Sequence, residues 1–143
     1  MKDGMAALRQ VALADSDISA MVDDRVFVGA LSKAAADAEA ALGGTRAPRP
    51  ILVLEHGGGP ANLDLLPVDT WSIVVTCYAQ TFRKADELRR AVWQRFRHLI
   101  RERFADVLIH RINPESGALS RREGEIVWPA YSQIFSVLAD VDE

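Results

Sequence analysis

The chain has 143 residues, of which 49% are hydrophobic and 26% are charged, values typical of one globular domain and not of a disordered or fibrous protein. Its net charge of −3 offers nucleic acid or an anionic membrane no overall attraction, so such a partner would need a local basic patch. A single cysteine, Cys77, excludes an intrachain disulfide and a multi-cysteine zinc site. No apolar stretch is long enough to span a membrane, so no transmembrane segment is expected. Arg9 and Gln10 interrupt the region where the apolar segment of an export signal would lie, so no export signal is expected.

The first third of the chain predicts short helices and one strand. Apolar residues recur every three or four positions from Met5 to Met21, with a break that predicts a helix and then a short second one capped by Asp15 or Ser16. Residues 25–28 resemble a short strand. Ser32 is expected to cap an alanine-rich helix over residues 33–42, and a proline-flanked extended connector follows at 45–50.

The rest of the chain predicts strands around one long helix. A strand is expected at 51–56, ended by the glycines and proline of 57–60 and followed by a polar loop to Pro67. Alternating β-branched residues predict a strand at 70–79. Thr81 is the expected cap of a helix running to about Phe104, and further strands are expected at 107–112 and from 126 to about 141, with a turn at 113–117. The helix carries one apolar stripe, formed by Phe82, Ala85, Leu88, Val92, Phe96 and Leu99.

The most conspicuous motif, His56-Gly57-Gly58-Gly59, matches the glycine loop that supplies oxyanion-hole amides in some esterases. Such an enzyme also needs a G-x-S-x-G nucleophile elbow, which the chain lacks, and no phosphate-binding glycine motif is present either. We therefore expect a flexible hairpin loop here, because glycine runs mark turns.

No other residues form a recognisable catalytic or metal-binding pattern. The histidines at 56, 98 and 110 lack metal-ligand spacing, and Cys77 lies among apolar strand residues, where a buried inert thiol is the common case. Acidic pairs at 23–24 and at Glu123 and Glu125 fall in predicted turns and are expected to be solvated. We expect no enzyme activity, no cofactor and no metal.

A basic segment is the clearest functional candidate. The segment from Arg83 to Arg103 contains eight basic and three acidic residues, which gives a local charge of +5. The remainder of the chain therefore carries −8. This predicts an amphipathic basic helix whose polar face is either simply solvated, a docking surface for an acidic partner such as another copy of the chain, or a contact to the nucleic-acid backbone. Arg90, Arg97 and Arg101 are expected to share one helix face with Arg83 nearby.

The order of these segments carries a family resemblance. A D-x-x-I-x-x-M-V-x-x-R-V-F passage at 15–27 precedes a strand at 50–55, a strand at 69–79 that runs into a helix beginning Thr81-Phe82-Arg83-Lys84-Ala85, and a closing strand at 131–137. The chain resembles the tail terminator, or tail completion, proteins of long-tailed bacteriophages (siphoviruses) and related prophage or gene-transfer particles.

The resemblance implies a single α+β domain over 1–143, with a small mixed or antiparallel sheet packed against helices. It also implies a virion protein assembled in the host cytoplasm into a hexameric ring at the head-proximal end of the tail, where it contacts the tail tube protein and the head connector. The expected interaction surface comprises Arg83, Arg90, Arg97, Arg101, Gly57, Gly58 and Gly59. The alternatives are another head-tail connector or adaptor, and a small nucleic-acid-binding protein using the helix at 83–103 without sequence-specific readout.

Overall fold

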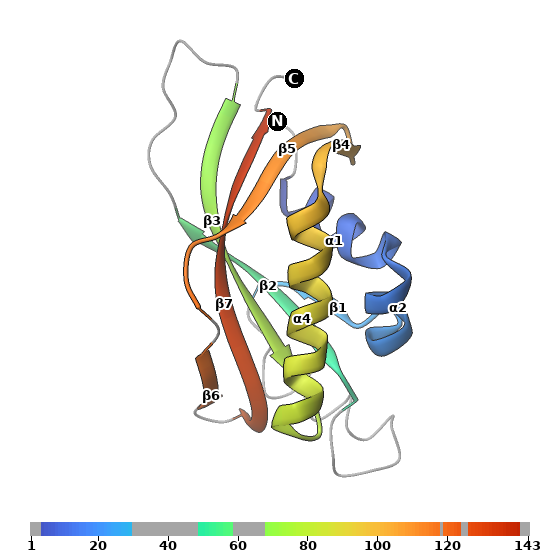
Figure 1. Cartoon of the computed structure of the whole chain (residues 1–143), viewed down its shortest axis with the longest axis vertical. Helices are drawn as coiled ribbons and strands as arrows, with labels where there is room; N and C mark the ends of the chain where they lie inside the picture. The colour runs from blue at the N-terminus through green and yellow to red at the C-terminus, as the bar shows by residue number, and fades with distance from the viewer. Residues whose placement is uncertain (1–3, 30–48, 59–67, 118, 124–125, 141–143) are drawn as a thin grey trace.

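The computed structural model describes residues 4–29, 49–58, 68–117, 119–123 and 126–140. These residues form a seven-stranded mixed sheet with helices packed on one face (Figure 1). The path through the sheet is β1-β2-β3-β7-β5-β4, and β6 also pairs with β7. Only β1 and β2 run parallel, and the other neighbours are antiparallel. A mixed sheet covered by helices is the arrangement that the resemblance implies. The expected helix at 33–42, with its cap Ser32, lies outside the described residues.

Two short helices open the described chain, α1 (Gly4–Ala14) and α2 (Ser16–Val22). The Asp15 carboxylate accepts hydrogen bonds from the amides of Asp17 and Ile18, which confirms the predicted N-cap between the helices. Strand β1 (Val26–Val28) follows, as predicted. Helix α1 contacts both β1 and β4, the two ends of the sheet path, and Arg9 Nε of α1 donates to the Val26 carbonyl at 2.9 Å. The Arg9 side chain therefore satisfies one backbone carbonyl of β1.

Strands β2 (Ile51–Gly58) and β3 (Val68–Tyr78) form an antiparallel pair, and β3 continues antiparallel to the long β7 (Ile126–Asp140). Alternation along β3 places Ile73, Val75 and Cys77 in the core under the helices, as predicted for this strand. The opposite face carries a second, smaller apolar cluster around Tyr78, and a buried contact of 3.1 Å between the hydroxyls of Thr76 and Ser132.

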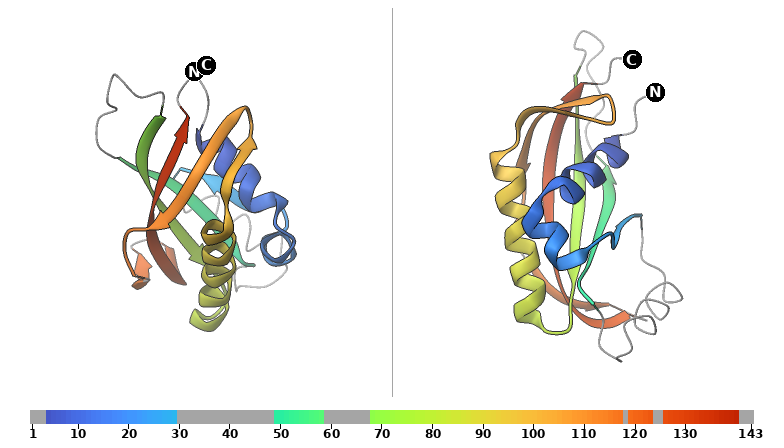
Figure 2. Two further views of the ribbon diagram at one scale, coloured as in Figure 1. Left: turned by 45° about the horizontal axis from the view of Figure 1, so that its top comes forward. Right: turned by 90° about the vertical axis from the view of Figure 1, so that its right-hand side faces the viewer.

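Helix α4 (Phe82–His98) lies across the sheet, and Figure 2 shows it beside the strands in two further views. Thr81 caps the helix by accepting from the Lys84 amide at 3.2 Å, as predicted. The stripe is confirmed at its central positions, because Leu88, Val92 and Phe96 are fully buried, and the Phe96 ring meets Phe135 of β7 edge-to-face at 5.1 Å.

The helix is shorter than predicted. It ends at His98, and residues 100–104 form strand β4 (Ile100–Phe104), antiparallel to β5 (Val107–Pro114). The prediction of a helix to Phe104 is therefore wrong, because the hairpin hydrogen bonds of β4 and β5 outweigh the helical propensity of these residues.

Three smaller corrections concern strand ends. Strand β2 runs through Gly57 and Gly58 instead of ending at His56, and β5 continues two residues into the predicted turn, to Pro114. Strand β6 (Leu119–Glu123) was not predicted, and it places Glu123 in a ladder with β7 instead of a turn. Glu125 lies outside the described residues.

Candidate interaction surface

The face of α4 that points away from the sheet is rich in arginine. Because the buried residues recur at helical spacing, the positions opposite them must face solvent. The Arg83 side chain is 89% exposed, the Arg90 side chain is 70% exposed, and Arg97 is exposed as well. The structure therefore brings these three predicted site residues together on one exposed helix face.

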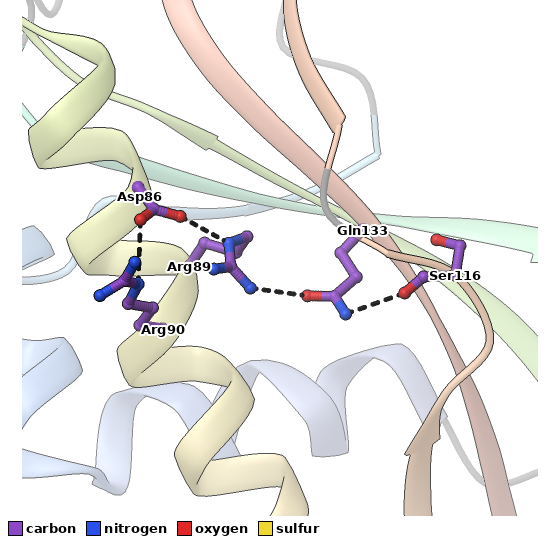
Figure 3. Close-up of polar contacts among 5 residues, drawn as sticks. All are labelled: Asp86, Arg89, Arg90, Ser116 and Gln133. Atoms are coloured by element: carbon purple, nitrogen blue, oxygen red, sulfur yellow. Dashed lines mark hydrogen bonds and ion pairs between the residues drawn. The ribbon is translucent and has the colours of Figure 1, made fainter.

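Carboxylates within and beside α4 neutralise part of this charge. Asp86 accepts from Arg89 Nε at 2.8 Å and from Arg90 Nε at 2.9 Å, so two guanidinium groups share one carboxylate (Figure 3). Arg83 lies 3.6 Å from Glu87. The helix sequence contains six basic and two acidic residues, a charge of +4. The surface is thus cationic, but several of its arginines already form ion pairs within the helix.

Arg89 also joins the helix to the sheet. Its Nη1 donates to the side-chain oxygen of Gln133 at 3.3 Å, and the Gln133 amide nitrogen donates to the Ser116 carbonyl at 3.0 Å (Figure 3). Gln133 is only 5% exposed, so these partners satisfy a buried amide. This chain of contacts has no signal in the sequence, because a lone glutamine in an apolar strand finds its partners only after folding.

A shallow hollow of about 280 Å³ lies on the same helix, lined by Arg89, Arg90, Trp93 and Gln94. The guanidinium carbon of Arg97 lies 5.0 Å from the centre of the Trp93 ring, within range of a cation–π contact. Arginine side chains and one half-buried aromatic ring therefore border a recess open to solvent. We call Arg83, Arg89, Arg90, Trp93, Gln94 and Arg97 the α4 basic surface.

Arg101 does not belong to this surface. It lies in β4 with a φ of 50°, at a break in the pairing between Ile100 and Glu102, so its expected place on the helix face is wrong. The nearby Arg95 points toward β4 instead of solvent, where Nη1 is 3.1 Å from a Glu102 oxygen. The basic segment is thus divided between two elements.

The predicted glycines are also separate from the α4 basic surface. Gly57 and Gly58 belong to β2, and Gly59 lies outside the described residues, as does the rest of the predicted loop to Pro67. The pairing with β3 shifts between His56 and Gly58, which makes Gly57 the extra residue of a β-bulge. A side chain at Gly57 would approach the Ser72 carbonyl to 3.3 Å, so glycine fits this close contact between strands.

The described residues provide little for catalysis. Cys77 is fully buried, and burial raises the pKa of its thiol, which disfavours the nucleophilic thiolate. Across the part of the chain that the structure describes, no group of three or more histidine, cysteine or acidic side chains is arranged to hold a metal ion. No helix in those ranges is long and apolar enough to cross a membrane.

Comparison with known proteins gives a similarity at the level of the fold. No protein family and no curated protein matches the sequence. Among solved structures, the fold is similar to a chain of a structure described as the virion of a native gene transfer agent particle, with a TM-score of 0.57 and 18% sequence identity. The match covers 96% of this chain and 94% of that chain. At this identity the similarity shows a shared fold over nearly the whole length of both chains.

Proposed function

We propose that this protein is a structural component of a phage-like particle, and specifically its tail terminator. In this role it forms a ring that caps the head-proximal end of the tail tube and joins the tube to the head connector. The observation that carries the proposal is the fold similarity to a virion chain over 96% of this chain and 94% of that one. A shared fold alone does not define a role. The proposal therefore also rests on the resemblance of the segments at 15–27, 50–55, 69–85 and 131–137 to tail terminator proteins.

The features of the chain suit an assembly role. Three exposed arginines, Arg83, Arg90 and Arg97, lie on one helix face, and the one thiol of the chain is buried in the core. Charged surfaces of this kind contribute to the rate and specificity of association.

Removing the gene from a particle-producing host tests the proposal. A missing terminator should leave tail tubes of uncontrolled length beside heads without tails, seen by electron microscopy, and expression of the wild-type chain should restore normal particles. Free tails of normal length that fail to join heads would instead identify a head-closure or adaptor protein. Normal, head-attached tails would refute a structural role at this junction.

A nucleic-acid-binding function predicts a different result. Backbone binding through α4 would release counterions, so affinity for duplex DNA would fall about 10-fold or more as salt rises from 50 to 200 mM. Because Asp86 and Glu102 already neutralise several of the arginines, we expect no measurable binding to duplex DNA at 150 mM salt in a fluorescence anisotropy titration.

A further inference from the structure

The α4 basic surface has a counterpart of opposite charge elsewhere on the molecule. Asp17 in α2 and the two residues that follow the helix, Asp23 and Asp24, are exposed. None of these carboxylates forms an ion pair among the described residues. The neighbouring Arg25 is only 8% exposed, and it donates to the carbonyls of Pro50 and Met21. We call Asp17, Asp23 and Asp24 the acidic corner.

The basic surface lies on α4 itself, and the acidic corner lies on the neighbouring helix α2 and just after it. Arg89, at the edge of the hollow, reaches Gln133 of β7, whereas α2 also contacts α4. In Figure 1 the strand β7 lies on one side of α4 and α2 lies on the other. The acidic corner is thus on the side of α4 away from β7, where it is available to the basic surface of a second copy. Such a contact joins two different patches and repeats from copy to copy, which closes a ring when the rotation between copies is suitable.

We propose, building on the ring-forming function above, that the α4 basic surface binds the acidic corner of a second copy of this chain. Arg90 and Arg97 provide the accessible guanidinium groups, and Asp17 and Asp24 are the carboxylates that they meet. The hollow beside Trp93 lies next to these guanidinium groups and is open to solvent. The stacking of Arg97 on Trp93 holds its guanidinium in place before binding, which lowers the entropy lost on association.

Paired charge reversals test this contact. We would compare the wild type with Arg90→Glu/Arg97→Glu, with Asp17→Arg/Asp24→Arg, and with the four changes combined. The matched control is Arg103→Glu/Arg111→Glu, which has the same net charge as the first variant. Its two arginines are exposed on β4 and β5 and do not belong to the α4 basic surface. Sedimentation velocity measures self-association over a range of concentrations and salt, and circular dichroism checks folding.

Each reversed pair should weaken self-association about tenfold or more, and the four combined changes should restore it to within about threefold of wild type. The control should assemble like wild type. Wild-type association should also weaken as salt rises, because exposed charges are screened. If a reversed variant fails to fold, Arg90→Gln/Arg97→Gln should still weaken assembly, and an unchanged assembly in that folded variant would overturn the contact.

The outcomes separate this contact from the function on which it rests. Wild-type rings that tolerate both reversals would overturn the contact and leave the ring-forming function standing. If both double variants weaken assembly and the combined variant does not restore it, the acidic corner is not the partner of the α4 basic surface. If the control variant weakens assembly equally, the effect comes from net charge and the contact is overturned. A wild type that stays monomeric at every concentration and salt would overturn both the contact and the ring.

Discussion

Leu88 gives the most direct test of how α4 is attached to the sheet. Its side chain is fully buried within the main core cluster, between the helix and the strands. Replacing Leu88 by alanine removes the equivalent of three methylene groups, which costs about 2.4 kcal/mol at ~0.8 kcal/mol for each group. The cavity left behind adds to this cost, so we expect a total loss of about 3 to 4 kcal/mol. For a chain of this length the loss corresponds to a Tm lower by about 10 °C.

Urea unfolding followed by far-UV circular dichroism measures this loss. The measurement should be made at low protein concentration and high salt to limit self-association, which would otherwise stabilise the folded state by mass action. Ile100→Ala is the matched control. It removes the same number of carbon atoms from a side chain in β4 that is 68% exposed, and should cost under about 0.5 kcal/mol. A similarly small loss for Leu88→Ala would refute the packing of α4 through its central stripe.

Three further predictions concern local structure. Thr81→Ala should lower the free energy of unfolding by about 1 kcal/mol, because the Lys84 amide loses its cap, while Thr81→Ser should retain most of it in the same urea assay. The β4–β5 turn holds Ala105 and Asp106 at φ values of 47° and 62°, a conformation that asparagine and glycine adopt more readily. Ala105→Asn/Asp106→Gly should therefore raise the Tm by a few degrees in a thermal melt. Cys77 should resist Ellman's reagent in the native state from pH 7 to 9 and react once urea unfolds the chain, because burial raises the pKa of its thiol. Rapid labelling without urea would show that this thiol is accessible.

The elements predicted well from the sequence are those whose local signals agree with their final packing. The break at Asp15 combines a capping side chain with a change in the apolar pattern, and both signals mark the start of α2. Thr81 likewise caps a helix whose apolar stripe is long enough to fix the buried face. Because these features depend on neighbours in the sequence, they can be predicted without knowing the rest of the fold.

The errors occur where strand pairing overrides the local preference of the residues. Residues 99–104 combine leucine, arginine and glutamate, which favour helix, yet Ile100–Phe104 pairs with β5. The ion pair of Arg95 with Glu102 then connects the helix to that strand. At Gly57 the glycine signal indicated a turn, whereas β3 holds the residue in a bulged ladder. In both places the pairing of the strands overrides the local preference of these residues, and the patterns of apolar and turn residues do not reveal that pairing.

The charge of +5 counted at residues 83–103 is larger than the positive charge that is available to a partner. Asp86 and Glu102 each lie within about 3 Å of an arginine, so several of the eight basic groups at 83–103 are committed to contacts inside the chain. An incoming carboxylate must compete with Asp86 for Arg90, whereas Arg97 is stacked on Trp93 and exposed. Each new exposed pair then contributes about 0 to 1 kcal/mol, too little for any single arginine to control assembly. The contact between copies should depend on several weak pairs at once, which is why paired reversals and their rescue are more informative than any single substitution.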